Sequence, residues 1–549
     1  MTFNFSFYLE NNLSVYIVGL WLAGGLIYLA FAYRTHLSLP KSILSVLFVL
    51  FCVYAISTAL LANEYSFRVL FKKEVVLYIN CILLFFFAYQ TTTTNPHLFA
   101  QLSFTLFYLS PILLIDFWWR EIIQDHYGPD GLMMTKHYLS MYCVLVLFAY
   151  CQFFTLKSWL PLTIVAGMLL TIIFSNSRAV YLASIIAIGT VVFLRYKHYI
   201  KWYYIVLSFL GIAGIAYLLY HIRPLSANGR LILWDTVWTI TDRVTWILGN
   251  GVGYIENKIL LLQAYYFMNQ PLEIGLYGGA VKTILNEYLT LLIEIGLVGL
   301  ILFVLLAAYL IINLLKKRKF YLIGGITGVA VFGFFSNPSF SLPLVMFIIT
   351  LTAYTAGCSK RQTILPSKAL PIVIVFGSLV MLCNTVYIHF FKRWYDRKDI
   401  PISAANPLDY TKWSVVMGDN PYFLNDYGIR LLAMDCIDEA DSVLAKAVSL
   451  RADVSNYLAY GQVMENRGKL DEAERNYRIA IAMQPKLFVP KYILFDMFRS
   501  HGLTEKAQQF AIEIRDYPVK IDNAEVREIK TTVHNYLKQN NYEAQEKPE

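Results

Sequence analysis

The chain has 549 residues, of which 57% are hydrophobic and 15% are charged, and its formal net charge is +9. A soluble domain of this size is about half apolar and about a quarter charged, so the composition excludes an ordinary soluble enzyme and predicts a membrane protein. No basic tract carries interleaved aromatic residues on a soluble surface, so we expect no nucleic-acid partner.

Windows of about 20 mainly apolar residues, the length that crosses a bilayer core of about 30 Å as a helix, recur through residues 1–391. We expect about twelve membrane spans in this all-α domain, of which the third and the tenth are short. The predicted ranges are Leu13–Tyr33, Ser42–Leu61, Val75–Tyr89, Leu98–Trp119, His137–Leu156, Ser158–Phe174, Arg178–Leu194, Trp202–His221, Ile284–Leu315, Phe320–Phe335, Ser341–Cys358 and Ala369–Phe391. The first stretch is too long for a signal peptide and lacks a basic leader, so no cleavable leader is expected.

Three groups of basic residues fall in loops of the same parity, which predicts that those loops are cytoplasmic. They are Arg195, Lys197 and Lys201, then Lys316–Lys319, then Lys360 and Arg361. The loop 222–283 is then extracytoplasmic, as is everything after Phe391. One loop disagrees, because Arg68, Lys72 and Lys73 fall on the outer side. Either the span count is off near the N-terminus, or these cations bind an extracytoplasmic anion.

Cysteine usage excludes two common kinds of site. Six of the seven cysteines fall within the predicted spans, and Cys436 stands alone in the soluble tail. The sequence therefore offers neither a disulfide framework nor a zinc-ligand pattern, and we expect no metal and no cofactor.

A second domain, 392–549, is predicted where the chain becomes charged and loses its long apolar runs. Small and aromatic residues recur there at the spacing of a helix-turn-helix repeat of about 34 residues, of the tetratricopeptide type. The recurring positions are Gly428, Ala440, Ala447, Tyr457, Gly461, Gly468, Ala473, Tyr477, Ala480, Pro485, Gly502 and Ala507. The pattern predicts an extracytoplasmic α-solenoid whose concave surface is offered to a protein partner, to another copy or to the membrane domain.

The stretch Gly229–Leu300 carries polar residues among the predicted spans, and such residues are seldom kept beside lipid without a function. It is expected to open on an amphipathic helix and to run through Ile284–Leu289 without a break into the next span. Its run of Gly249, Gly251 and Gly253 is predicted to form a turn rather than a nucleotide-binding loop, because no strand precedes it.

Several short motifs follow one another in this region. They are Ser177-Arg178, Gly229-Arg230 with Trp234, Gly249-Asn250-Gly251-Val252-Gly253, Asn286-Glu287-Tyr288-Leu289 and Glu294-Ile295-Gly296-Leu297-Val298-Gly299. Their order resembles the bacterial O-antigen ligase superfamily, which also holds O-antigen polymerases and protein O-oligosaccharyltransferases. The resemblance covers 174–300 and implies a polytopic, GT-C-like helix bundle. A tail of tetratricopeptide repeats is similar to what several members carry.

The resemblance implies metal-independent transfer of an undecaprenyl-diphosphate-linked glycan to an acceptor hydroxyl at the outer face of the bacterial inner membrane. Guanidinium groups stabilise the charge that a diphosphate leaving group gains. We predict Arg178 and Arg230 for this role, because Arg178 lies at a span boundary and Arg230 follows Gly229, which lets the backbone turn close to a ligand. The alternatives are a snorkelling anchor for Arg178, and helix capping or an ion pair with Asp235 for Arg230.

Five further residues are predicted to bind substrate. Trp234 is expected to stack on a sugar ring, although tryptophans on interfacial helices commonly serve as anchors. Gln263 and Tyr266 fit the family's loop pattern, with an ordinary place on a helix surface as the alternative. Asn286 belongs to the Asn-Glu motif, and Lys73 is the cation that faces a predicted extracytoplasmic anion.

The sequence departs from the family at Leu285, where many ligases have a histidine that is the usual candidate for the catalytic base. Glu287 is then predicted as the base, with favourable interaction at a helix N-terminus as the alternative. Glu294, two turns along the same face, extends the polar path or pairs with a basic group. Without either carboxylate, transfer depends on the arginines and on positioning.

The leading prediction is thus a ligase or oligosaccharyltransferase that places a glycan on lipid A-core or protein, with its C-terminal domain in the periplasm and membrane lipids around it. One alternative is an O-antigen polymerase, whose acceptor is another lipid-linked repeat. Another is a non-catalytic scaffold that uses its helical repeats. A transporter is disfavoured, because it would place charges at the bilayer midplane on broken helices.

Overall fold

In the computed structural model, most of the described residues are helical. The described residues are 14–32, 38–40, 42–62, 71–123, 136–199, 201–222, 224–275, 277–357, 362–364, 370–398, 407–519 and 522–540. Within them, the strand β1 (Ser38–Pro40) pairs antiparallel with β2 (Gln362–Ile364), with Ser38 opposite Ile364. The chain forms two compact units, which are described separately. Unit 1 comprises Met1–Ala227, Arg243–Gly253 and Thr283–His389, and unit 2 comprises Asn228–Asp242, Tyr254–Lys282 and Phe390–Glu549.

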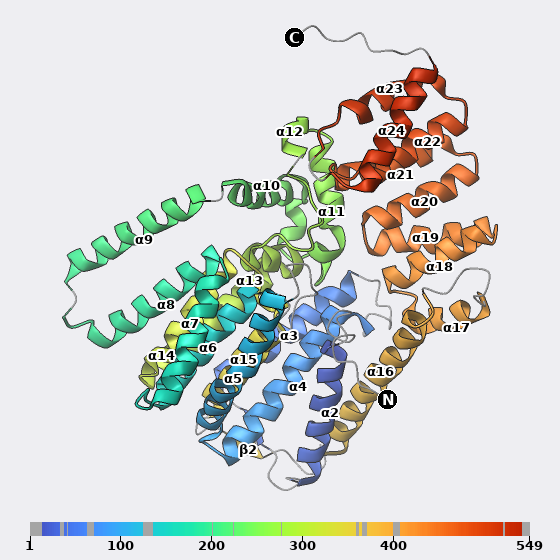
Figure 1. Ribbon diagram of the computed structural model, residues 1–549. Coiled ribbons are helices and arrows are strands. Elements are labelled where there is room, and N and C mark those ends of the chain that lie inside the picture. Colours follow the sequence, from blue (N-terminus) through green and yellow to red (C-terminus); the bar gives the residue numbers. More distant parts are fainter. Residues whose placement is uncertain are drawn as a thin grey trace. The chain divides into compact units, whose positions relative to one another are not determined.

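Unit 1 contains the apolar helices, the last of which ends in unit 2, and each predicted span overlaps one of them. They are α2 (Ser14–Ala32), α3 (Ile43–Leu61), α4 (Lys73–Thr94), α5 (Leu98–Ile123), α6 (Lys136–Phe153), α7 (Trp159–Phe174), α8 (Arg178–Tyr196), α9 (Trp202–Ile222), α13 (Glu287–Lys316), α14 (Phe320–Gly333), α15 (Leu342–Gly357) and α16 (Leu370–Tyr395), with the short helices η2 (Arg243–Trp246) and η3 (Pro338–Phe340). Figure 1 shows α6, α7, α8 and α14 side by side, and α14 packs against both α6 and α8.

Six described helices are long and apolar enough to cross a membrane, which makes this a multi-pass membrane protein. They are Ile43–Leu61, Lys73–Thr94, Leu98–Ile115, Arg178–Tyr196, Glu287–Lys316 and Pro371–Tyr395. Four shorter apolar helices accompany them: Ser14–Leu29, Trp159–Phe174, Phe320–Gly333 and Leu342–Gly357. The total of about twelve spans stays a prediction.

The helix α13 differs from the predicted span in two ways. It begins at Glu287 rather than continuing smoothly from Ile284, and it is interrupted at Gly296, whose φ is 69° and ψ is −178°. The interruption leaves the carbonyls of Ile293 and Glu294 without their usual helical donors, which is costly in a bilayer unless other groups bond to them.

The glycine run of the loop supplies those missing bonds. The backbone N–H of Asn250 donates to the Ile293 carbonyl (2.9 Å) and that of Gly251 donates to the Glu294 carbonyl (2.8 Å), while the Asn250 side-chain amide adds a bond of 3.0 Å to Ile293. In return, the N–H of Val298 donates to the Ile247 carbonyl (3.4 Å). The run therefore forms a turn that completes a broken helix.

The close fit of this turn gives the first prediction. A Cβ atom on Gly296 would lie 2.4 Å from the Ile247 carbonyl oxygen, and one on Gly249 would lie 2.3 Å from the Glu294 oxygen. Gly296→Ala should therefore lower the free energy of unfolding by at least about 2 kcal/mol, because it adds a clash to a strained backbone. Thermal unfolding of the detergent-solubilised protein checks this. Gly189→Ala is the control, since nothing lies within 4 Å of its added Cβ. Equal melting of the two variants would contradict the account.

Unit 2 combines the loop helices with the C-terminal helices. The loop helices are α10 (Pro224–Ile240, which begins in unit 1), α11 (Tyr254–Phe267) and α12 (Leu272–Gly275). The C-terminal helices are α17 (Pro407–Met417), α18 (Pro421–Ala433), α19 (Ile437–Leu450), α20 (Val454–Asn466), α21 (Leu470–Met483), α22 (Val489–Ser500), α23 (Thr504–Asp516) and α24 (Ala524–Gln539). The domains predicted from sequence, 1–391 and 392–549, assign the loop helices and the C-terminal helices to different domains. In the structure both belong to unit 2, where α11 packs against α21.

The C-terminal helices pack in consecutive pairs, α18 with α19, α20 with α21 and α22 with α23. The predicted small residues lie where paired helices meet: a Cβ on Gly428 would lie 2.3 Å from Leu444, and one on Gly461 would lie 2.4 Å from Tyr477. Asp435, Gly468 and Gly502 each have positive φ at the turn within a pair. This regularity agrees with the repeat pattern, and the tetratricopeptide assignment stays a prediction.

One lysine of unit 2 is buried and gives a pH-dependent prediction. Lys491 is 1% exposed, its ammonium group donates to the carbonyls of Pro485 and Leu487, and it lies 3.7 Å from the Tyr517 ring centroid. Burial lowers the pKa of Lys491 from 10.5 to about 8, against the opposing charge of Glu513.

Between pH 8 and 10.5 the unfolded lysine therefore keeps a proton that the folded lysine has lost, so raising the pH favours the folded state. Thermal unfolding of the full chain from pH 7 to 9.5 should show the wild type gaining stability relative to Lys491→Met. Parallel pH profiles of the two proteins would show that Lys491 titrates normally.

Candidate functional site

The N-terminus of α13 is shaped by Asn286. Its side-chain oxygen accepts a hydrogen bond from the N–H of Leu289 (3.0 Å), and its carbonyl accepts one from the Thr290 hydroxyl (2.8 Å). Asn286 is thus an N-cap that stops the helix from starting earlier, which places Glu287 at the first helical position. The prediction that Asn286 also contacts substrate stays untested.

The carboxylate of Glu287 is tied to the segment between α14 and α15. One of its oxygens accepts hydrogen bonds from the Ser339 hydroxyl (2.9 Å), the Ser339 N–H (3.4 Å) and the Asn337 side-chain amide (3.5 Å). These donors orient the carboxylate. The first turn of α13 therefore presents a carboxylate held by three hydrogen bonds, and the role of Glu287 as catalytic base stays a prediction.

Asn337 is the buried centre of this cluster, with 0% exposure. Besides Glu287, its amide nitrogen donates to the Thr290 hydroxyl (3.1 Å), and its amide oxygen accepts from the Thr283 hydroxyl. Sequence reasoning missed Asn337 and Ser339. The available signal was the short polar interruption Ser-Asn-Pro-Ser between two apolar stretches, since an Asn-Pro pair marks a loop.

Leu285 directly precedes the N-cap residue of α13, and its backbone is unusual. Its φ is 53°, in the left-handed region that non-glycine residues rarely enter, and its N–H donates to the Thr283 hydroxyl (2.9 Å). Such conformations persist where neighbouring bonds enforce them, commonly near functional sites. The loop that enters α13 is therefore held in a defined shape next to Glu287.

Arg178 lies at the same end of unit 1 as Glu287. The helices α8 and α14 run antiparallel, because Gly328 packs near Ala183 and Gly324 packs near Val191. The first residue of α8 is thus level with the last turn of α14, where a Cβ on Gly333 would lie 3.4 Å from the Cβ of Glu287. We call this end of the bundle, which holds Glu287, Ser339 and Arg178, the Glu287 end.

Two more cations lie at the Glu287 end. Lys73 is the first residue of α4, and its ammonium group is 5.8 Å from the ring centroid of Phe340, the neighbour of Ser339. Lys136 is the first residue of α6, whose Tyr138 ring lies 6.0 Å from the Phe332 ring at the end of α14. Three helices therefore begin with a basic residue at one end of the bundle.

The other end of unit 1 carries the residues predicted to be cytoplasmic. Arg195 donates to the Tyr321 hydroxyl (3.0 Å), Lys317 donates to the Thr355 carbonyl (3.3 Å), and the Lys319 ammonium group lies 4.6 Å from the Phe153 ring centroid. Lys73 is thus opposite these cations, as the predicted parity requires. Arg68, Lys360 and Arg361 lie outside the described residues.

The remaining predicted site residues lie in unit 2. Arg230 and Trp234 are half-buried residues of α10, and Gly229 lies inside this helix, so the expected turn at Gly229 is wrong. The Tyr266 hydroxyl of α11 donates to a carboxylate oxygen of Asp235 (2.5 Å). Burial and this bond to the charged Asp235 raise the pKa of Tyr266 to about 12, so Tyr266 stays a hydrogen-bond donor at neutral pH.

Gln263 is a structural link within unit 2. Its side chain is 1% exposed, and its amide nitrogen donates to the carbonyls of Met483 (2.6 Å) and Gly279 (3.3 Å). Gln263 thus joins α11 to the end of α21, and the prediction that it contacts a sugar stays untested.

The predicted site residues fall into two groups. Lys73, Arg178, Asn286 and Glu287 lie together in unit 1, whereas Arg230, Trp234, Gln263 and Tyr266 belong to unit 2. The convergence of the two arginines on one substrate stays a prediction. In the described ranges, no three His, Cys, Asp or Glu side chains are grouped to hold a metal ion.

The Asn337 cluster gives a prediction for stability. Asn337→Ala removes donors from Glu287 and Thr290 inside a buried site, so it should cost about 1–3 kcal/mol in the free energy of unfolding. Asn313→Ala is the control, because the Asn313 amide bonds only one turn back, to the Tyr309 carbonyl at 2.7 Å. Thermal unfolding in detergent compares them. If both variants melt like the wild type, Asn337 does not hold the Glu287 end together.

Comparison with known proteins adds one finding. A model of the O-antigen ligase family matches residues 163–304, a segment that includes Arg178, Arg230 and Glu287. No curated protein and no solved structure gave a match. The match covers well under half of the chain, and it supports membership of the O-antigen ligase superfamily and lipid-linked glycan transfer of the ligase or polymerase type.

Proposed function

We propose that the chain transfers a glycan from an undecaprenyl-diphosphate carrier to an acceptor hydroxyl at the outer face of the inner membrane, as an O-antigen ligase or protein O-oligosaccharyltransferase. The observation that carries the proposal is the Glu287 end, where basic residues start three helices beside a fixed carboxylate. The family match includes two members of this group, Arg178 and Glu287.

Electrostatics explains why those cations point to an anionic substrate. A helix N-terminus carries about half a positive charge, so a basic residue there is unfavourable, by about 0.3–1 kcal/mol in exposed positions. Lys73, Lys136 and Arg178 all break this rule at the same end of the bundle. A diphosphate suits such a place, because it accepts hydrogen bonds from guanidinium, ammonium and helix N–H groups.

The proposed reaction is a substitution at the anomeric carbon of the glycan. The acceptor oxygen forms the new glycosidic bond as the bond from that carbon to the diphosphate breaks, and undecaprenyl diphosphate leaves with the electron pair. Arg178 stabilises the charge on the leaving group, and Glu287 takes the proton of the acceptor hydroxyl and returns it to water. Ser339 and Asn337 hold the Glu287 carboxylate in place. No metal ion is required in this scheme.

Unit 2 contributes through its loop helices. The proposal assigns Arg230 a second guanidinium contact to the diphosphate, and Trp234 and Tyr266 contacts to the glycan. All three lie in the segment that matches the family model. They share a tied framework, because Tyr266 of α11 is bonded to Asp235 of α10, the helix that carries Arg230 and Trp234.

Loss of the Arg178 guanidinium tests the proposal. Arg178→Ala should reduce glycan transfer at least about 100-fold, the usual effect of removing one group that stabilises the leaving charge. Arg178→Lys should retain part of the activity, since it keeps the charge but not the fork. Staining of surface glycan in a complemented deletion strain measures the transfer. Arg195→Ala, at the opposite end of unit 1, is the control and should stay active. Full activity of Arg178→Ala would rule out this site.

Gel analysis of the deletion strain identifies the acceptor. Loss of all capped lipid A-core assigns ligation, and altered mobility of secreted proteins assigns protein glycosylation. A core that carries a single repeat assigns polymerisation, which uses the same donor site with a lipid-linked repeat as acceptor. No change in any glycan would leave the chain a non-catalytic scaffold and contradict the proposal.

A further inference from the structure

The loop between the membrane helices is bonded to the backbone of the C-terminal helices. The N–H of Ala452 donates to the Asn257 carbonyl of α11 (2.8 Å), and the Lys258 ammonium group donates to the Ser449 carbonyl. Ala452 and Ser449 flank the turn between α19 and α20. The start of α11 is thus fixed to one turn of the C-terminal helices by bonds that any displacement of the loop must break.

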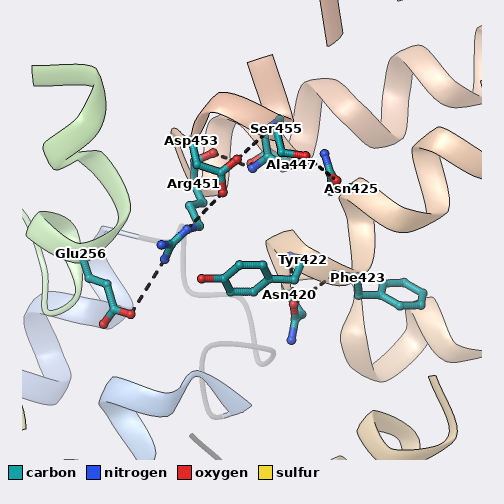
Figure 2. A network of polar contacts seen from close by, with 10 residues as sticks. Glu256, Asn420, Tyr422, Phe423, Asn425, Ala447, Arg451, Asp453 and Ser455 are labelled. Carbon is teal, nitrogen blue, oxygen red and sulfur yellow. Dashed lines mark hydrogen bonds and ion pairs between the residues drawn. The ribbon is translucent and has the colours of Figure 1, made fainter. Parts of the chain in front are cut away.

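Arg451 reinforces this contact in the same turn. Its guanidinium lies 3.8 Å from the Glu256 carboxylate of α11 and 3.3 Å from that of Asp453, and it stacks 4.9 Å from the ring centroid of Tyr422 (Figure 2). Its side chain is 8% exposed and that of Glu256 is 13% exposed. Removing one partner of a nearly buried ion pair strongly destabilises the folded protein, because the other charge stays buried without a partner.

The far end of α11 is fixed in a second place. The buried Gln263 amide donates to the Met483 carbonyl at the end of α21. Close packing supports the contact, since a Cβ on Gly278 would lie 2.6 Å from the Phe267 ring and 2.9 Å from Pro485. Both ends of the helix are therefore held, which sets its direction as well as its position.

The hydrogen bond between Tyr266 and Asp235 links the position of α10 to that of α11. Tyr266 follows Gln263 by one turn on α11, and Asp235 lies on α10 with Arg230 and Trp234. A shift of α11 on the C-terminal helices must therefore move Arg230, unless the Tyr266 bond breaks.

We propose that the surface formed by the turn 449–453 and by the end of α21 binds the chain's own loop, and that Arg451 and Gln263 are positioning residues for Arg230. The C-terminal helices then serve glycan transfer by setting the place of the loop arginine, and this face of theirs is filled without an external protein. The proposal rests on the function proposed above, because Arg230 is its target.

Hydrogen–deuterium exchange of the full-length protein in detergent tests the contact. Arg451→Gln should speed exchange at least about tenfold in α11 and in the turn that carries Ala452, since local opening then requires fewer contacts to break. Arg467→Gln is the matched control, because Arg467 pairs with Asp441 (2.6 Å) and Asp438 (2.5 Å) within the C-terminal helices. If Arg451→Gln leaves α11 as protected as Arg467→Gln does, the proposed surface is wrong.

Transfer kinetics test the positioning role. Detergent-solubilised membranes of the deletion strain supply acceptor, and undecaprenyl-diphosphate-linked glycan extracted from that strain is the donor. Arg451→Gln should raise the KM for the donor about tenfold with a smaller change in kcat. Arg451→Lys should bring the KM most of the way back to the wild-type value. A merely structural role would lower the amount of active enzyme and leave KM unchanged. Gln263→Met, which keeps the side-chain volume, provides a second variant if Arg451→Gln does not fold.

The two proposals fail in different ways. If Arg230→Ala retains full transfer, the role proposed for Arg230 in glycan transfer is wrong, whatever the hydrogen–deuterium exchange of α11 shows. If Arg230→Ala abolishes transfer while Arg451→Gln and Gln263→Met keep the wild-type KM, the function stands and the positioning role is wrong.

Discussion

In a bilayer, every backbone N–H and C=O group needs a hydrogen-bond partner within the protein, and this constraint shapes unit 1. Helix α13 breaks at Gly296, and the carbonyls freed by the break are bonded by the N–H groups of Asn250 and Gly251. A distant loop is thus bound into the wall of the bundle. Broken helices in transporters use such carbonyls to bind ions, whereas here backbone donors already occupy the carbonyls of Ile293 and Glu294. The break therefore serves architecture, and the charges that suggest chemistry lie at the Glu287 end.

The Glu287 end gathers features that local stability alone would not select. Basic residues start three helices there, Leu285 has a left-handed backbone, and Asn337 is a fully buried polar side chain. Together they place the Glu287 carboxylate at the same end of the bundle as Lys73, Lys136 and Arg178. Functional sites are where sequences most often break the rules of local structure. The same set of groups suits a diphosphate that leaves and a hydroxyl that attacks.

The apolar helices were predictable because their length and composition are local properties. Helix α4 is longer than the predicted Val75–Tyr89 for a local reason that was overlooked: the hydroxyls of Thr91 and Thr92 donate back to helix carbonyls, so the polar end stays helical. Glu287 could also be placed at a helix start from sequence. Its partners Asn337 and Ser339 could not, because they reach it across the fold. The link between Gln263 and Met483 joins residues more than 200 positions apart, which no periodicity reports.

The loop helices and the C-terminal helices belong to one compact unit, so the C-terminal helices bind another part of the same chain. A helical repeat surface commonly suggests an external partner. Here one face already holds α11 through Ala452, Arg451 and Gln263. The free energy of these contacts is available to fix the loop before a substrate arrives, and such preorganisation lowers the cost of binding.

The central proposal is that Arg178 and Arg230 bind one diphosphate together with the Glu287 end. An electron cryomicroscopy map of the full chain with undecaprenyl diphosphate tests this claim directly. The account predicts both guanidinium groups at hydrogen-bond distance, about 3 Å, from the diphosphate oxygens, with the Glu287 carboxylate nearby. A diphosphate bound elsewhere, or either arginine turned toward lipid or toward the end that holds Arg195 and Lys319, would contradict it.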